Sequence, residues 1–217
     1  MKRNDIYKKL VLGLLFIFPL LVYLFFASGK NNFAKLPILT ADVQELPLKS
    51  GLPQLMNHIT ILGYWGGSLE NKKAEALNLN EKIYKRFYQF EDFQFVFLVD
   101  SSRITQVEDL KNALKVGAGT DLSRWNFIPT DSAAINKHFT SLSTPLTLEQ
   151  DASSPYVFII DKDLNLRGRN DDEDLGTLYG FDARSVAQIN KKMIDDVKVI
   201  LAEYRLALKI YNTERSK

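Results

Sequence analysis

Side chains that commonly carry out chemistry in proteins are scarce in this sequence. Its 217 residues include no cysteine, which excludes disulfides, thiol catalysis, cysteine-ligated metal sites and covalent haem attachment. Its two histidines, His58 and His138, are too few for a multi-histidine metal site within one chain. No histidine base can be assigned to Ser68, Ser153 or Ser154, so a Ser-His-Asp triad is not indicated. We therefore predict no catalytic residue, no metal site and no cofactor, and expect that the chain is not an enzyme.

Two parts of the sequence are candidate metal-binding sites. The run Asn170–Asp174 is rich in oxygen ligands, but it lacks the alternating spacing and the central glycine of a calcium-binding loop, which favours a solvated loop. A copper site built from Met56, His58 and His138 is an alternative, although three scattered soft ligands make a poor site.

One short motif is the main candidate for a binding function. Tyr64-Trp65-Gly66-Gly67-Ser68 follows an apolar segment and precedes a stretch with helical periodicity. Large aromatic side chains anchor protein partners, glycines allow a partner's backbone to approach, and free amides at a helix start can attract an anion. The motif is therefore our candidate protein-binding site. The alternative is a strand-to-helix turn that requires glycine, with both aromatic side chains packed over the core.

The elements that position this motif alternate between strand and helix patterns. Apolar, β-rich segments predict strands, whereas apolar residues at steps of three and four predict helices. Together they predict an α/β sandwich with a mixed sheet. Strands are predicted over 58–62, 94–100, 125–128 and 154–163, the last with a hairpin partner at 164–169, and helices over 69–89, 107–116, 132–139 and 183–209, the last capped by Asp182.

A membrane segment precedes this domain. Leu10–Ala27 is free of charged residues and spans about 27 Å as a helix, enough to cross a hydrocarbon core. The tail 1–9 carries a net charge of +3, which by the positive-inside rule keeps the N-terminus cytoplasmic and places the globular domain outside the cytoplasm, in the periplasm if the envelope has two membranes. A cleaved signal peptide is the alternative, but the run is long and its exit is a poor cleavage site. We predict a tail at 1–9, a membrane helix at 10–27, a linker at 28–50 and a domain at 51–217.

Several local patterns are shared with known thioredoxin-like proteins. The entry Ser154–Tyr156 resembles their cis-proline turn, whose loop contacts bound peptide, and this resemblance adds Pro155 to the candidate protein-binding site. The strand and turn Phe158–Asp163 is similar to their f-l-i-D-k-x-G pattern, although the next residue is not the usual glycine. Trp125–Phe127 resembles the W-x-f element of the Sco/SenC family, which the anchor and short linker also fit. The chain thus resembles a thioredoxin-like, Sco/SenC-like membrane-anchored protein over about residues 36–205.

The departures from that family bear on function. Sco/SenC proteins hold copper with two cysteines after the first core strand and with a distant histidine before a later strand. The matching positions here fall in Tyr64–Ser68 and near Ser153, and neither carries a ligand. Dithiol exchange is excluded as well, because no thiolate can form. The resemblance therefore implies a degenerate active site, in the setting of respiratory oxidase assembly.

These observations lead to one predicted function and two alternatives. We predict a membrane-anchored, non-catalytic thioredoxin-like binding module, an accessory factor in cytochrome oxidase assembly with a protein partner in or at the membrane. The alternatives are a permanent structural subunit of a membrane complex and an active metallochaperone with atypical ligands. Nucleic-acid binding is not expected, because Leu10–Lys217 carries a net charge of −1 and implies no basic face.

The predicted final helix is longer than the sheet it covers. At about 1.5 Å per residue it spans roughly 40 Å, whereas a typical core strand spans only about 17–20 Å. Its second half remains apolar and needs a cover. We expect the linker to supply it, through Leu36, Ile38, Leu39 and Val43, with a partner chain as the second choice.

Overall fold

The computed structural model describes residues 3–28, 35–47, 51–118 and 121–215, which divide into two units at residue 34. The first unit holds one helix, α1 (Arg3–Ser28). Its segment Ile6–Phe26 is long and apolar enough to cross a membrane, a test that a signal sequence also passes. The predicted membrane helix thus lies inside α1. Parts of the predicted tail and linker, at 1–2, 29–34 and 48–50, lie outside the described residues.

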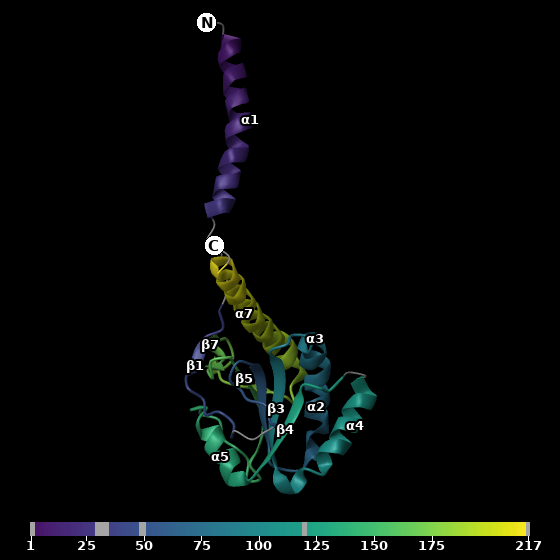
Figure 1. The fold of residues 1–217 in the computed structure, drawn as a ribbon. Helices are drawn as coiled ribbons and strands as arrows, with labels where there is room; N and C mark the ends of the chain where they lie inside the picture. Colours follow the sequence, from purple (N-terminus) through teal and green to yellow (C-terminus); the bar gives the residue numbers. More distant parts are fainter. Residues whose placement is uncertain (1–2, 29–34, 48–50, 119–120, 216–217) are drawn as a thin grey trace. The chain divides into compact units, whose positions relative to one another are not determined.

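The second unit is built on a mixed sheet (Figure 1). The three strands at one end of the sheet order, β2, β3 and β4, run parallel to one another, and the strands on the other side of β2 are antiparallel to their neighbours. In the described part of the chain the sheet has seven strands in the order β1-β6-β5-β2-β3-β4, and β9 pairs with β5. They are β1 (Ile38–Thr40), β2 (Ile59–Trp65), β3 (Phe93–Asp100), β4 (Trp125–Thr130), β5 (Ser153–Ile160), β6 (Leu166–Arg167) and β9 (Phe181–Asp182); β7 (Arg169–Asp172) and β8 (Gly176–Leu178) form a separate hairpin.

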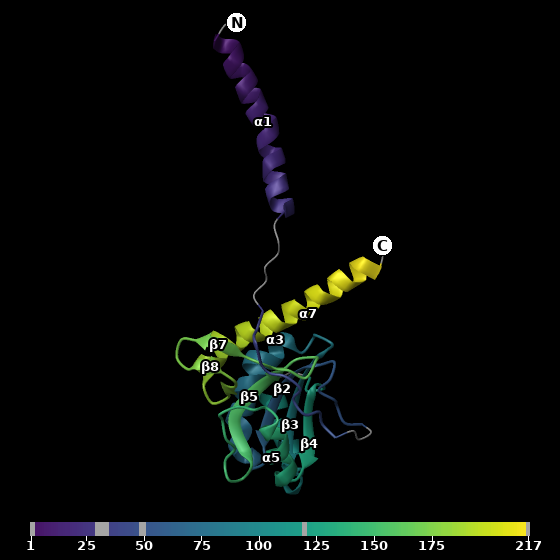
Figure 2. The ribbon, with the colours of Figure 1, turned by 90° about the vertical axis from the view of Figure 1, so that its left-hand side faces the viewer.

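Each face of the sheet has its own apolar core, because successive strand residues point to opposite faces. Phe95 and Phe97 of β3 join one core, whereas Val96 and Leu98 join the other. The first core is covered by η1 (Leu69–Lys72), α2 (Lys73–Leu79), η2 (Asn80–Tyr84), α3 (Lys85–Phe87), α4 (Gln106–Ala118), η4 (Ile189–Met193) and α7 (Ile194–Arg215). The short α6 (Val186–Gln188) leads into η4 and has no buried residue. The second core is covered by α5 (Ser132–Thr140) and by residues 43–47 and 51–55 (Figures 1 and 2), while the short η3 (Ser101–Arg103) links β3 to α4.

The predicted α/β sandwich is confirmed, with differences at element ends. β2 continues to Trp65, beyond the predicted strand end at residue 62 and two residues into the candidate motif. Two π-helical stretches, η2 and η4, interrupt the long helices. The final helix is capped by Ser185, whose Oγ accepts a hydrogen bond from the Gln188 amide at 3.2 Å, and not by Asp182, which pairs in β9.

The linker also differs from its prediction. The compact unit begins at Lys35, and Ile38–Thr40 forms the edge strand β1, paired with β6. This pairing leads the chain past the sheet edge to the opposite face, where Val43 joins the second core. Leu36 alone of the four expected residues lies in the core beneath α7, and Ile38 is exposed. The expected cover of the final helix by the linker is therefore wrong for three of its four residues.

A buried arginine connects three segments that are distant in sequence. The side chain of Arg167 is 4% exposed. Its Nε donates to the Leu36 carbonyl at 2.8 Å, and its two terminal nitrogens pair with Asp161 at 2.8 Å and with Glu203 at 2.6 Å. The Asp161 carboxylate also accepts hydrogen bonds from the main-chain amides of Asp163 and Asn165. The domain's entry segment, the β5–β6 turn and α7 thus share one charge centre.

Replacing this arginine should destabilise the domain strongly. Arg167→Leu would leave the buried Asp161 carboxylate without its cation, at a cost of about 3–5 kcal/mol in unfolding free energy. The matched control is Arg184→Leu, because Arg184 is 56% exposed in its pair with Asp182 and should change stability by about 1 kcal/mol or less. Chemical denaturation of the full chain in detergent measures both. Equal losses in the two variants would contradict the role of Arg167.

Candidate functional site

The aromatic pair of the candidate motif is part of the core. Tyr64 and Trp65 have no exposed surface. Trp65 stacks on Phe97 with 3.8 Å between ring centroids, and Tyr64 packs edge-on against Phe139 on the other face. Consecutive strand residues point to opposite faces, so one aromatic fills each core. Neither side chain can anchor a partner in this structure, so the predicted binding site is wrong for these two residues, and both pack on the core as in the alternative interpretation of the motif.

The two glycines of the motif are covered by the chain itself. The Gly66 amide donates to the carbonyl of Ala152 at 3.3 Å. A Cβ on Gly66 would lie 2.4 Å from the Asp151 carbonyl oxygen, and one on Gly67 would lie 1.9 Å from Oδ2 of Asp151. Glycine is therefore required because residues 151–152 pack directly on this turn. Both glycines are buried and only Ser68 is partly exposed, so the motif is not an open partner surface.

The covering segment is held by its own hydrogen bonds. The Ser153 amide donates to Oδ1 of Asp151 at 3.1 Å, and the Ser153 hydroxyl donates to Glu149 at 3.2 Å. The Ala152 amide donates to the Glu149 carbonyl at 3.0 Å. These bonds make residues 149–153 a compact cap over the turn, at the position where the family resemblance places a histidine ligand.

Pro155 lies in a regular strand. No cis peptide bond occurs among the described residues, so the expected cis-proline turn is wrong. Pro155 is buried within β5, and its carbonyl accepts a hydrogen bond from the Ala183 amide at 2.9 Å. Its main chain is thus occupied by β9 and the segment that follows it, and it does not present a free peptide-binding edge.

The expected anion site at the helix start is also occupied. The Leu69 amide, the first of η1, donates to Oε1 of Gln106 at 2.9 Å. Nearby, the buried Lys72 Nζ donates to Glu75 at 3.1 Å and to the Ser154 carbonyl at 3.3 Å. Burial raises the pKa of Glu75, and the Lys72 ammonium only partly offsets this effect.

The three candidate soft ligands for copper do not meet. His58 precedes β2, and its Nδ1 pairs with the Met56 carbonyl at 3.0 Å. His138 pairs with Tyr64 near the other end of β2, about 20 Å along the strand. Among the described residues no group of three or more His, Cys, Asp or Glu side chains could hold a metal ion.

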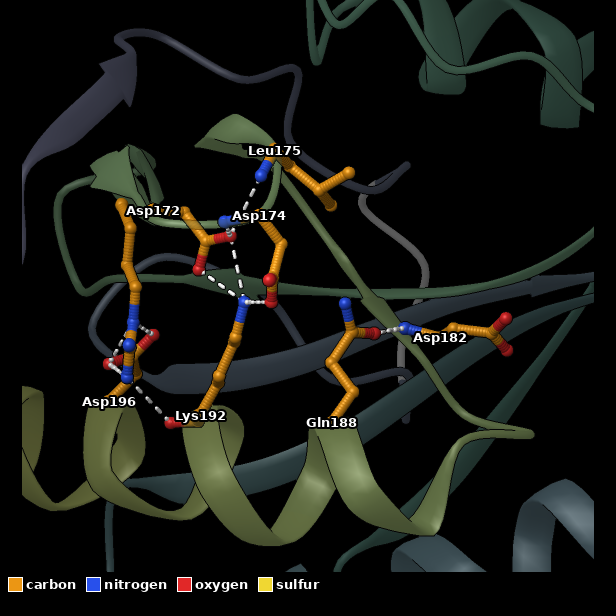
Figure 3. A network of polar contacts seen from close by, with 8 residues as sticks. Asp172, Asp174, Leu175, Asp182, Gln188, Lys192 and Asp196 are labelled. Atoms are coloured by element: carbon orange, nitrogen blue, oxygen red, sulfur yellow. Dashed lines mark hydrogen bonds and ion pairs between the residues drawn. The ribbon is translucent and has the colours of Figure 1, made fainter.

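The acidic run around Asp172 forms part of a closed ionic network (Figure 3). It lies in β7 and in the turn that follows, where the Lys192 ammonium points from the final helix to Asp172 at 2.6 Å and to Asp174 at 2.7 Å. Beside it, the Arg169 guanidinium pairs with Asp196 at 2.7 Å. Hydrogen bonds from Lys192 help to hold the pKa of Asp172 below its usual value, against the effect of burial. These carboxylates fasten the β7–β8 hairpin to the final helix.

A buried tyrosine–histidine pair was missed by our sequence reasoning. Tyr64 Oη and His138 Nδ1 lie 2.8 Å apart, and the side chains of both residues are buried. Burial raises the pKa of Tyr64 well above its usual value, so the phenol keeps its proton. We assign this hydroxyl as the donor to Nδ1, which corresponds to the imidazole tautomer with its proton on Nε2. The spacing of Ile135, His138 and Phe139 on one face of α5 was the signal that could have placed this histidine inside.

His138 is neutral and its second nitrogen is unpaired. Burial lowers its pKa to about 4, and the main-chain carbonyl of Gln44 and the carboxylate of Glu45 only partly offset this effect. With Nδ1 accepting from Tyr64, Nε2 carries the ring proton. Among the described residues Nε2 makes no hydrogen bond of normal geometry, although the Gln44 main chain is close enough to favour the charged ring.

A cavity of about 210 Å³ adjoins this histidine. Its lining includes apolar side chains of β3 and β4, Leu98 and Ile128, opposite Leu46 and Leu52 of the entry segment. Lys137 of α5 lines it from an exposed position. The cavity lies toward the carboxyl ends of parallel strands, the end at which open α/β sheets usually bind ligands.

Comparison with known proteins gives a likeness in fold. No family model and no curated protein matches this chain. A SCO1/SenC family lipoprotein from Bacillus anthracis str. Ames is similar over 77% of this chain and 99% of that chain, with a TM-score of 0.52 and 14% identity. This protein has a thioredoxin-like fold with structural similarity to Sco/SenC proteins. BsSco, described as a member of the Sco family of cytochrome c oxidase assembly proteins, has a TM-score of 0.46 at 7% identity over 76% of this chain and 94% of that one. Apo Sco1 from Thermus Thermophilus has a TM-score of 0.45 at 10% identity over 78% and 98%.

The thioredoxin-like fold of this chain carries a turn, Tyr64–Ser68, that cannot perform thiol chemistry. It has no cysteine, and its described residues hold no group suited to a metal. The turn after the first core strand is filled by aromatic core residues and covered by residues 149–153. The fold without these ligands fits a non-redox role.

The cover predicts a coupling between Gly67 and Asp151. Gly66→Ala and Gly67→Ala should each lower the unfolding free energy by about 1–3 kcal/mol, because their Cβ atoms overlap residues 151–152. Asp151→Ala should relieve the Gly67→Ala clash, which involves the Asp151 carboxylate. It should not rescue Gly66→Ala, whose clash is with main-chain oxygens. Double-mutant cycles measured by denaturant unfolding test this, and additive losses at Gly67 and Asp151 would contradict it.

The buried histidine predicts an acid-sensitive stability. Its pKa falls from 6.5 in the unfolded chain to about 4 in the folded one. Between these values the unfolded state binds a proton that the folded state does not, so stability falls as the pH falls. The loss should approach about 3 kcal/mol below the folded pKa.

The control for this pH effect is His138→Gln, which retains His58 and all carboxylates. Unfolding free energies of both proteins should be measured from pH 7.5 to pH 4. The unsubstituted chain should lose more stability than the variant across this window. Parallel pH profiles would show that His138 does not titrate as described.

Proposed function

We propose that this chain is a membrane-anchored, non-catalytic thioredoxin-like module that binds a partner protein. The observation that carries the proposal is the closure of the turn after β2 by residues 149–153, in a chain without cysteine. A redox protein needs this turn open, because a substrate disulfide must reach a thiolate there. Here the chain retains the fold but fills the turn with its own backbone, which supports binding elsewhere on the domain.

The outer edge of β4 argues against a partner that adds a strand to the sheet. β4 is the last strand in the sheet order. Its Trp125 amide already donates to the Leu122 carbonyl at 3.0 Å, and Pro129 has no amide hydrogen to offer. A partner would therefore recognise side chains. The surface of α5 beside the cavity is the region that we assign to this contact.

Attachment to the membrane is the second part of the proposal. The segment Ile6–Phe26 has the length and hydropathy of a membrane span, and the basic tail favours a cytoplasmic N-terminus. The similar structure from Bacillus anthracis is described as a lipoprotein, which supports a location at the membrane. The domain would then lie outside the cytoplasm. Because of the Sco/SenC resemblance we propose an accessory role in respiratory oxidase assembly.

The absence of native cysteine permits a specific test of location and partner. Lys137→Cys on α5 and Lys198→Cys on α7 each introduce one thiol at an exposed lysine. A membrane-impermeant maleimide should label both in intact spheroplasts. A photo-crosslinker attached at position 137 should capture one partner of defined mass, and the same reagent at position 198 should not.

The outcomes separate the proposal from its alternatives. Labelling only after permeabilisation would refute the orientation, and no partner at position 137 would refute the binding role. A partner that co-purifies at fixed stoichiometry without crosslinking would instead indicate a permanent subunit. A tightly held stoichiometric metal ion in the purified full chain would support an active metallochaperone and contradict the non-catalytic role.

A further inference from the structure

The cavity beside His138 has walls that the chain holds in place. The Glu45 carboxylate accepts hydrogen bonds from the main-chain amides of Leu46, Leu55 and Met56 at 2.7 to 2.8 Å. The Gln44 amide donates to the Ser141 hydroxyl at 3.1 Å, which ties this wall to the end of α5. The cavity is therefore built by fixed main chain on one side and by the sheet on the other.

Its lining defines the chemistry of a ligand. The apolar surface of Leu98, Ile128 and Leu52 favours an apolar group. A nitrogen that carries a proton and lacks a partner, Nε2 of His138, favours a hydrogen-bond acceptor, because an unsatisfied buried donor is costly. The Lys137 ammonium favours negative charge on that acceptor.

The volume limits the size of the ligand. Drug-sized ligands and larger cofactors occupy pockets of about 300–1,000 Å³, more than the 210 Å³ present here. Apolar cavities of about 150 Å³ accept benzene. A single ring or branched alkyl group with one small polar group fits these limits.

We propose that this cavity binds a small apolar group that carries a carboxylate, with the apolar part on Leu98 and Ile128 and the carboxylate between His138 and Lys137. Two sources share this chemistry: a free aromatic or branched-chain carboxylic acid, and the C-terminal residue of a polypeptide. The inference does not require the protein partner proposed above. If the chain binds a partner protein but no carboxylate, this inference is wrong and the proposed function stands.

The two histidines make the test direct. Selective ¹³C labelling of histidine gives ring signals from His58 and His138 alone, and His138→Gln assigns them. Benzoate titrated into the full chain in detergent micelles should shift the His138 signal saturably and leave the His58 signal unchanged. Benzyl alcohol keeps the ring but lacks the charge, and should bind at least about tenfold more weakly.

Two peptide probes distinguish the sources. A short peptide that ends in phenylalanine with a free carboxylate should bind more tightly than benzoate if the natural ligand is a polypeptide C-terminus, and its C-terminal amide should bind at least about tenfold more weakly. Preference for benzoate over the peptide would identify a free acid. Either result supports a carboxylate site.

A cavity-filling variant keeps the inference falsifiable even if His138 variants fail to fold. Ala134 is a half-buried residue of α5 that lines the cavity. Ala134→Phe should weaken benzoate binding at least about tenfold, so that benzoate no longer shifts the variant's own His138 signal. Lys137→Gln should weaken it a few-fold. Unchanged affinity in Ala134→Phe, no saturable shift with any probe, or equal affinity for benzoate and benzyl alcohol would each overturn the proposal.

Discussion

The buried guanidinium of Arg167 is the interaction on which the arrangement of this domain depends most. It neutralises Asp161 in the β5–β6 turn, pairs with Glu203 of α7 and binds the Leu36 carbonyl of the entry segment. A buried charge of this kind is tolerated only when nearly all of its donors are satisfied, so each segment constrains the other two. Since β6 also pairs with β1, the same centre determines where the entry segment passes the sheet edge. That passage leads residues 44–47 and Leu52 to the face where they form one wall of the cavity.

At the C-terminal end of β2 the structure is determined by close packing. Gly66 and Gly67 bring the chain within contact distance of Asp151 and Ala152, and no larger residue fits without displacement. Trp65 stacks on Phe97 beneath this contact, and Tyr64 fills the other face. The turn is therefore a packed junction between β2 and the segment that leads into β5. The cavity lies instead at the ends of the neighbouring strands β3 and β4, beside α5.

The sequence was informative where periodicity and composition determine structure. Apolar strands such as 94–100, the helix over 132–139 and the α/β sandwich were all predictable, because burial of one face produces a regular pattern. The sequence did not decide between partner contact and core packing for Tyr64 and Trp65, since an aromatic at the end of a strand can point to either with the same local sequence. The role of the two glycines depends on residues 151–152, which only the tertiary fold brings near. The Tyr64–His138 pair likewise joins a strand and a helix far apart in the chain.

In this chain without thiols, the closed turn satisfies its main-chain groups by hydrogen bonding. An open turn without cysteine would leave the Gly66 amide and the Leu69 amide without protein partners over an aromatic core. The chain supplies both partners itself, from the Ala152 carbonyl and the Gln106 side chain. Buried main-chain groups need such partners, so the cover satisfies a requirement that the turn would otherwise meet with solvent or ligand. On the same side of the sheet as Tyr64, Nε2 of His138 is one of several buried side-chain atoms without a partner among the described residues, and it adjoins a cavity. The main-chain amides of the turn are thus satisfied by the chain itself, whereas His138 combines an unpaired buried side-chain nitrogen with an adjacent cavity.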